Sequence, residues 1–311
     1  MPSVEQLSDK IGVRVKGIDL SDPLSSSDFD FVYQSLVNHK VIAFSDQNLS
    51  PEQHVSFSKR FGTCDVHSNN QYLLDGFPEI LVLSNDLKDG KPIGVVDAGV
   101  EWHSDLSWQV DPPLGSILYC LKTPKIGGDT GFINMGAVYQ ELPNHLKKTV
   151  ENLEGVHCVS KLLNRRVTIS ENRVNAREFY AQQLDKHPPV KHPLVYRHPE
   201  SNEIILFASP RFTIGISDIP EDEGQAILDE LFEVVERTNA KLEYHWATGD
   251  GTTTGRGIME WKDLADGNFE GGRAATEFSE ALSVESTGAL SNPEFTGGAE
   301  NMGRYHFQAL D

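Results

Sequence analysis

The chain has 311 residues, of which 38% are hydrophobic, so it is long enough to bury a substantial core. Its formal net charge of −19 argues against nucleic acid or an anionic membrane surface as a partner. The same charge means that an anionic substrate must be attracted by a few local cations, against the field of the whole protein.

The first sixty residues predict a strand, a helix, a second strand and a second helix. The first strand is expected at residues 12–18, where the pattern alternates, and the first helix at residues 28–38, where it is amphipathic. The second strand is expected at the apolar residues 41–44. The second helix has a strong start signal, because Ser50 can cap it, Pro51 suits its first position and Gln53 completes a capping box.

The middle of the chain alternates between apolar runs and helical patterns. The expected strands lie at residues 80–83, 116–121, 132–133, 192–197, 204–207 and 241–246. The expected helices lie at residues 137–153, with a break at Pro143, and at residues 225–237. A turn-rich link at 198–202 predicts a hairpin between two of the strands.

The last sixty residues differ in composition from the rest of the chain. Residues 251–303 are rich in Gly, Ala, Ser, Thr and Glu, so we expect this stretch to be atypical and loop-rich. No internal repeat or linker marks a boundary, and we interpret residues 1–311 as a single domain.

Cysteine usage and the N-terminus indicate the compartment. The three cysteines are isolated from one another and odd in number, so we expect reduced, structural thiols. The first residues lack a basic segment followed by an apolar one, and no apolar run approaches the ~20 residues of a membrane helix. We therefore expect a soluble, cytoplasmic protein.

One short stretch, residues 101–108, carries the strongest chemical signal. His103 and Asp105 are two residues apart, so in an extended strand both side chains project from the same face. An imidazole and a carboxylate that converge on one point can hold a divalent metal ion. With a third ligand from elsewhere, they form the facial triad of non-haem Fe(II) oxygenases.

Several stretches together resemble the taurine dioxygenase-like (TauD/TfdA) Fe(II)/2-oxoglutarate-dependent oxygenases. They occur in the order of the family's motifs from Gly12 to Asp250. The stretches are Trp102-His103-Ser104-Asp105, Gly127-Gly128-Asp129-Thr130, His192-Pro193-Leu194-Val195, His198-Pro199, Phe212-Thr213 with Ile216, and His245-Trp246 with Gly249-Asp250.

The resemblance implies both a fold and a reaction. The fold is mainly β with flanking α, with a double-stranded β-helix (jelly-roll) core decorated by helices. The reaction uses Fe(II), O2 and the co-substrate 2-oxoglutarate to oxidise a small, anionic organic molecule, with release of succinate and CO2. A homo-oligomer is also compatible with the sequence.

The same resemblance implies roles for single residues. His103 and Asp105 are the metal ligands and catalytic residues, and Thr130 matches the family's co-substrate threonine. Trp108 and Phe212 line the substrate pocket. The plain structural readings are that Thr130 is only a turn residue and that Phe212 only fills the core.

The sequence departs from the family pattern after Asp250. Arg256 matches the motif's arginine, but the preceding Trp, Asp and Asn are missing, and Glu260 stands where a histidine is expected. Three alternatives remain open. Glu260 is the third metal ligand, His306 supplies it from a rearranged C-terminus, or the site is damaged.

The co-substrate arginine also has two candidates. Arg273 and Arg304 both lie in segments similar to the family's last strand, and we prefer Arg273. An arginine is expected because its planar fork pairs a carboxylate through two hydrogen bonds. The leading hypothesis is therefore an oxygenase. The alternatives are a catalytically impaired relative that binds a small molecule or a protein, and a non-redox metal hydrolase.

Overall fold

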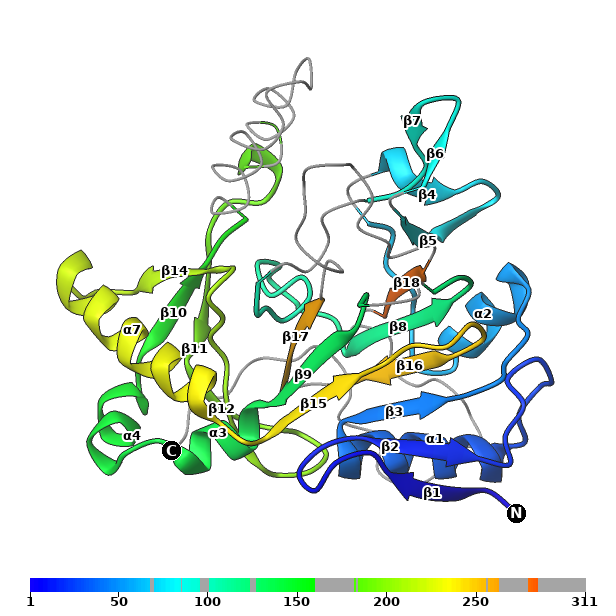
Figure 1. The fold of residues 1–311 in the computed structure, drawn as a ribbon. Helices are drawn as coiled ribbons and strands as arrows, with labels where there is room; N and C mark the ends of the chain where they lie inside the picture. The colour runs from blue at the N-terminus through cyan, green and yellow to red at the C-terminus, as the bar shows by residue number, and fades with distance from the viewer. Residues whose placement is uncertain are drawn as a thin grey trace.

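The computed structural model describes residues 1–67, 70–84, 86–95, 101–123, 127–159, 182, 184–255, 257–262 and 279–284. The described part is mainly β, with helices on the outside (Figure 1). Among the described helices, none combines the length and the apolar character that crossing a bilayer requires.

The largest unit is an eight-stranded sheet. Its strands, in spatial order, are β1 (Ser3–Gln6), β2 (Val13–Lys16), β3 (Val41–Phe44), β16 (Gly251–Thr254), β8 (Gly115–Cys120), β18 (Ser279–Val284), β5 (Phe77–Leu83) and β4 (Leu73–Leu74). Only the β2–β3 pair is parallel; the other neighbours are antiparallel.

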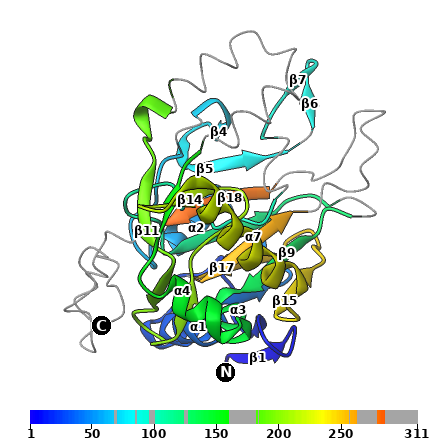
Figure 2. The ribbon, with the colours of Figure 1, turned by 90° about the vertical axis from the view of Figure 1, so that its left-hand side faces the viewer.

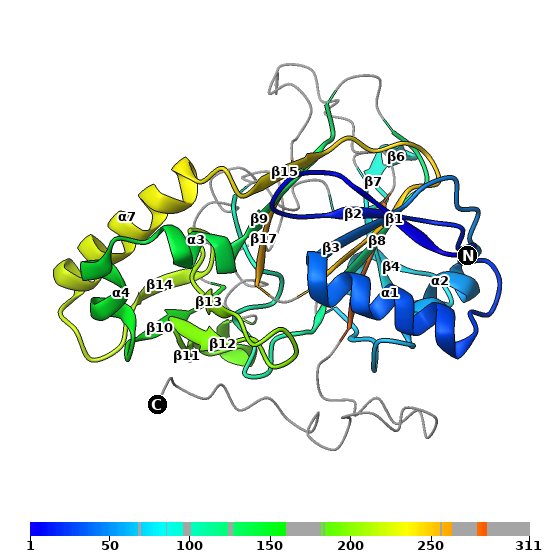
Figure 3. The same cartoon turned by 90° about the horizontal axis from the view of Figure 1, so that it is seen from below.

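Three smaller sheets complete the fold. The first contains β15 (Lys241–Tyr244), β9 (Thr130–Asn134) and β17 (Ile258–Lys262). The second contains β11 (Val190–Pro193), β10 (Glu154–His157) and β14 (Thr213–Ile216). The third is the hairpin of β12 (Val195–Arg197) and β13 (Ile204–Leu206). In Figure 3 β9 and β17 lie near the centre, and the strands β10 to β14 lie to the left. A separate hairpin joins β6 (Leu87–Lys88) and β7 (Lys91–Pro92), and a short 3-10 turn, η1, spans Asn70–Tyr72.

Helices cover both outer sides of these sheets. The helices α1 (Ser26–His39) and α2 (Pro51–Ser58) pack on the large sheet. The helices α3 (Met135–Glu141), α4 (Asn144–Val150) and α7 (Glu221–Arg237) pack on the smaller sheets, and α7 lies in front of β9 and β17 in Figure 2. The predicted capping box of α2 is present, with Ser50 and Gln53 hydrogen-bonded in both directions.

Strand β3 shows how the layers are joined. Its side chains alternate, so Ile42 and Phe44 pack against α1 and α2. Val41 and Ala43 instead belong to the cluster of Phe132 on β9, which lies between the sheets. The large sheet is therefore buried on both faces at its centre, and its inner face meets the smaller sheets.

The expectation of loops in residues 251–303 was wrong for the described part of that stretch. It contains β16, β17 and β18, and β16 pairs with β3 on one side and with β8 on the other. Its residues Thr252, Thr253 and Thr254 are all nearly inaccessible to solvent. Threonine is polar but β-branched, so it suits a strand although it adds little to an apolar pattern.

The cysteines agree with the expectation of structural thiols. Cys64, Cys120 and Cys158 are all buried, and none takes part in a disulfide. Burial raises the pKa of the Cys64 and Cys120 thiols to about 11, so neither is ionised near neutral pH.

Candidate functional site

His103 and Asp105 do converge, but not from an extended strand. Residues 105–108 form a turn, in which Ser107 N–H donates to the Ser104 carbonyl at 3.3 Å and Leu106 has a φ of 52°. His103 Nε2 and Asp105 Oδ1 are 3.2 Å apart. The two side chains thus share a side, as strand alternation would also place them, although a turn begins at Asp105.

The orientation of the His103 ring is fixed by the backbone. Its Nδ1 lies 2.7 Å from the Glu101 carbonyl oxygen, which can only accept, so Nδ1 carries the proton. The other ring nitrogen, Nε2, then faces Asp105. The imidazole is buried and lies edge-to-face against Phe212, with ring centroids 5.9 Å apart.

Asp105 is held from the large sheet. Its Oδ2 accepts a 2.6 Å hydrogen bond from Ser116 Oγ on β8, which leaves Oδ1 on the side of His103. Ser116 lies opposite Thr254 of β16, and the Thr254 hydroxyl is hydrogen-bonded to both the N–H and the carbonyl of Ser116. Strand β16 thus supports the serine that orients the carboxylate.

The two donors fit a divalent metal ion. Two ligand atoms at about 2.1 Å from one ion, with an angle near 90° between them, lie roughly 3 Å apart. The observed separation of 3.2 Å is close to that value, and both side chains are oriented by a second hydrogen bond, as metal ligands usually are. One imidazole and one carboxylate are two of the three donors of a facial triad.

The third donor is not settled by the described residues. They contain no group of three His, Cys, Asp or Glu side chains that could share one ion. Glu260 lies on β17, opposite Phe132 of β9 in the ladder, and Phe132 is buried between the sheets. Arg273, Arg304 and His306 lie outside the part of the chain that the structure describes.

The predicted pocket residues lie next to the two donors. Trp108 and Phe212 are both buried and belong to one apolar cluster with Leu106 and Val159. Phe212 contacts the His103 ring, so the apolar cluster borders the metal-binding pair directly. Whether Trp108 and Phe212 contact a substrate stays a prediction.

Thr130 is the first residue of β9 and is buried. Its hydroxyl accepts a 2.9 Å hydrogen bond from the indole Nε1 of Trp246, and its neighbour Asp129 pairs with His245 at 2.8 Å. Trp246 was not among the predicted site residues, although it lies within a family-like motif. The hydroxyl of Thr130 can still donate its own hydrogen to an anionic ligand.

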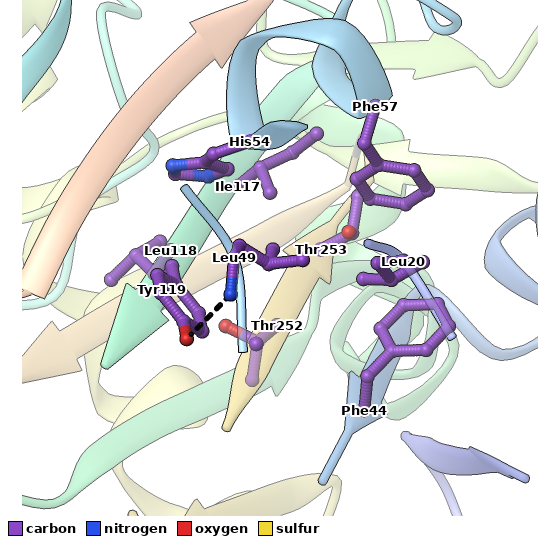
Figure 4. A pocket seen from close by; sticks show the side chains of 11 residues that line it. Leu20, Phe44, Leu49, His54, Phe57, Ile117, Leu118, Tyr119, Thr252 and Thr253 are labelled. Atoms are coloured by element: carbon purple, nitrogen blue, oxygen red, sulfur yellow. Dashed lines mark hydrogen bonds between the residues drawn. The ribbon is translucent and has the colours of Figure 1, made fainter. Parts of the chain in front are cut away.

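A small cavity occurs elsewhere, on the outer face of the large sheet. It lies beneath α2 and is lined by Phe44, Phe57, His54, Ile117 and Thr253, among others (Figure 4). The Tyr119 hydroxyl, which accepts from Leu49 N–H at 3.0 Å, is at its edge. Because side chains alternate along β8, Ile117 and Tyr119 are on the face opposite Ser116, so this cavity is not the candidate site.

The sequence was compared with protein families and with characterised proteins, and both comparisons identify dioxygenases. Residues 3–252 match the sequence profile of the family described as "Taurine catabolism dioxygenase TauD, TfdA family". The chain is 29% identical over 247 residues to an alpha-ketoglutarate-dependent 2,4-dichlorophenoxyacetate dioxygenase of Cupriavidus pinatubonensis, covering 76% of this chain and 83% of the relative. It is 27% identical to an alpha-ketoglutarate-dependent sulfate ester dioxygenase of Pseudomonas putida, covering 79% of each.

Comparison with a solved structure supports the same family for the fold. The crystal structure of a taurine dioxygenase from Burkholderia xenovorans superposes with a TM-score of 0.73 at 26% identity, covering 91% of this chain and 89% of that one. The predicted jelly-roll core with flanking helices is thus confirmed. The match to the family profile ends within β16, so Glu260 lies beyond it.

Proposed function

Because the chain belongs to the TauD/TfdA family of dioxygenases, we propose that it is an Fe(II)- and 2-oxoglutarate-dependent oxygenase. Its substrate would be a small, anionic organic molecule, oxidised by O2 with release of succinate and CO2. Relatives named as dioxygenases of an aryloxyacetate and of sulfate esters support an anionic substrate, since both compound classes carry a negative charge.

The observation that carries this proposal is the convergence of His103 Nε2 and Asp105 Oδ1, 3.2 Å apart. Both groups are oriented before any ion binds, His103 by the Glu101 carbonyl and Asp105 by the Ser116 hydroxyl. Such pre-orientation lowers the cost of binding, because little side-chain freedom remains to be lost. Bound Fe(II) would supply the redox chemistry with O2.

We assign the remaining roles by position. Thr130 would bind the distal carboxylate of 2-oxoglutarate, with its hydroxyl held by Trp246 so that the hydrogen is free to donate. Arg273 or Arg304 would supply the opposing positive charge. Trp108 and Phe212 would line the pocket and exclude water from the metal-binding pair.

For the third metal ligand we propose Glu260. Strand β17 brings it opposite Phe132, which lies in the interior between the sheets. A set of one imidazole and two carboxylates is harder and more anionic than the family's usual set with two histidines, so the iron would be held with a different redox potential. His306 is the alternative donor.

A second candidate function is supported by one specific observation. The family match ends at residue 252, and the described residues hold no group of three His, Cys, Asp or Glu side chains that could share one ion. A relative with an incomplete metal site would keep the fold and bind a small molecule or a protein without turnover.

One experiment separates the two candidates. The protein is mixed anaerobically with Fe(II) and 2-oxoglutarate, and the visible spectrum is recorded. An oxygenase gives a weak charge-transfer band and then, in a screen of sulfonates, sulfate esters and aryloxy acids, substrate-dependent succinate. Absence of both the band and succinate supports the binding module instead.

Variants assign the ligands. His103→Ala should abolish the band, while His145→Ala, at an exposed histidine that pairs with Glu230, should leave it unchanged. If Glu260→His raises turnover, Glu260 occupies the ligand position. If Glu260→His changes neither iron affinity nor turnover, our placement of Glu260 is wrong.

A further inference from the structure

Two buried histidines lie directly beneath the turn that carries Asp105. His157 on β10 and His192 on β11 come from neighbouring antiparallel strands, and their ring centroids are 5.2 Å apart. Both are almost fully buried. His157 also stacks on Phe207, with ring centroids 5.1 Å apart and an interplanar angle of 17°.

Each histidine is hydrogen-bonded to a different point of the segment that follows Asp105. His157 Nδ1 is bonded to Ser107 Oγ at 3.1 Å, two residues after Asp105. His192 Nε2 donates to the Gln109 carbonyl at 2.9 Å. The segment is therefore attached to the β10–β11 ladder at two positions.

This segment needs external support because its backbone is strained. Leu106 has a φ of 52°, in the left-handed region that a leucine rarely adopts. Such a conformation is unfavourable for a leucine and persists only where the surroundings enforce it. Leu106 lies between Asp105 and Ser107, so loss of the Ser107 contact would allow the turn to relax and Asp105 to move.

The buried surroundings of His157 favour an uncharged ring. Nδ1 of His157 is hydrogen-bonded to Ser107, and Nε2 is buried. A protonated ring would have a second N–H to satisfy inside a buried site. Burial and the adjacent His192 both lower the pKa of His157, so the ring is neutral at physiological pH.

We propose that His157 is a positioning residue for the metal centre, which fixes Ser107 and thereby holds Asp105 in place for metal binding. The inference rests on the proposed function of His103 and Asp105 as metal ligands. It assigns the effect of His157 to the hydrogen bond at Nδ1, rather than to the packing of its ring on Phe207.

Two variants separate these contributions. His157→Phe keeps an aromatic ring on Phe207 but removes the hydrogen bond. His157→Asn keeps a polar atom near the position of Nδ1 but removes the ring. Mn(II) is used as the probe, with binding to the whole apo-protein followed by titration, and thermal unfolding is recorded for each variant.

We expect His157→Phe to weaken Mn(II) binding about tenfold, as loss of a group that orients a metal ligand commonly does. His157→Asn should bind Mn(II) more tightly than His157→Phe, although it is the less stable of the two. The variant Ser107→Ala should match His157→Phe, and the double variant should bind no more weakly than either single one, because both remove the same hydrogen bond.

Three results of the Mn(II) titrations would overturn the inference: affinity of His157→Phe within twofold of wild type, tighter binding by the Phe variant than by the Asn variant, or additive effects in the double variant. Failure of the wild-type protein to bind Mn(II) would instead refute the proposed function.

Amide hydrogen exchange then decides whether His157 holds the turn. His157→Phe should speed exchange of residues 104–109 selectively, and unchanged exchange there would refute the positioning role.

Discussion

Replacing Ser116 by alanine should weaken metal binding about tenfold and leave the fold intact. The hydroxyl of Ser116 donates to Asp105 Oδ2 at 2.6 Å, and a hydrogen bond to a charged acceptor contributes about 1.5–3 kcal/mol. Because the Asp105 side chain is 30% exposed, water replaces part of the lost bond. We therefore expect a loss just below that range, about 1.4 kcal/mol, which corresponds to about tenfold in dissociation constant.

The assay is a titration of the apo-protein with Mn(II), repeated anaerobically with Fe(II). The matched control is Ser58→Ala on α2, because the Ser58 hydroxyl is also buried and also makes one hydrogen bond, 2.8 Å to the His54 carbonyl. Both variants should lose similar stability, but only Ser116→Ala should lose metal affinity. Equal affinities for the two variants would refute the view that the β8 hydroxyl orients Asp105.

Three further predictions test the fold, its pH dependence and the co-substrate site. Gly115→Ala should prevent folding, because a Cβ there would lie 1.7 Å from a backbone oxygen of β16, whereas Gly215→Ala meets nothing within 4 Å and should melt like wild type. The folded pKa of His157 is about 3, below its ordinary value of 6.5, so the unfolded chain binds the extra proton between these values. Urea unfolding should therefore show stability falling by up to about 1.4 kcal/mol per pH unit below pH 6.5, and His157→Phe should flatten this slope. Trp246→Phe removes the hydrogen bond to Thr130 and should raise the KM for 2-oxoglutarate severalfold with little change in kcat; a loss confined to kcat, measured by succinate formation, would contradict this role.

The sequence was sufficient where local chemistry alone determines structure. Ser50 and Gln53 specify a capping box within four residues, and the structure forms it. The hairpin expected around residues 198–202 also forms, because a turn-rich link joins two apolar runs and Val195 pairs with Leu206 in register. Each of these features depends only on residues near one another in the chain.

Other features depend on distant partners and could not be predicted. The run at residues 192–197 divides into two strands at Leu194, whose N–H donates to the Leu153 carbonyl while its own carbonyl accepts from Phe207. The left-handed Leu106 has no sequence signal, since leucine gives no hint of a positive φ. The residues after it are hydrogen-bonded to histidines of β10 and β11, contacts that local pattern analysis does not include.

The candidate site combines both situations: contacts between residues close in the chain could be predicted, and contacts between distant residues could not. His103 and Asp105 are close in sequence, and their spacing predicts that the two side chains converge. Ser116, by contrast, gives no signal in a strand otherwise read as apolar, although its hydroxyl orients the carboxylate. Support from a neighbouring sheet becomes visible only when the strands are placed side by side.

The position of β16 has a consequence for the order in which the protein can assemble during synthesis. This strand, from residues 251–254, is inserted between β3 and β8, both of which leave the ribosome more than a hundred residues earlier. Until it arrives, those two strands have unpaired backbone edges that can recruit other chains. The gap between β3 and β8 can therefore close only after translation has passed residue 254, and an incomplete polypeptide should depend on chaperones to avoid aggregation.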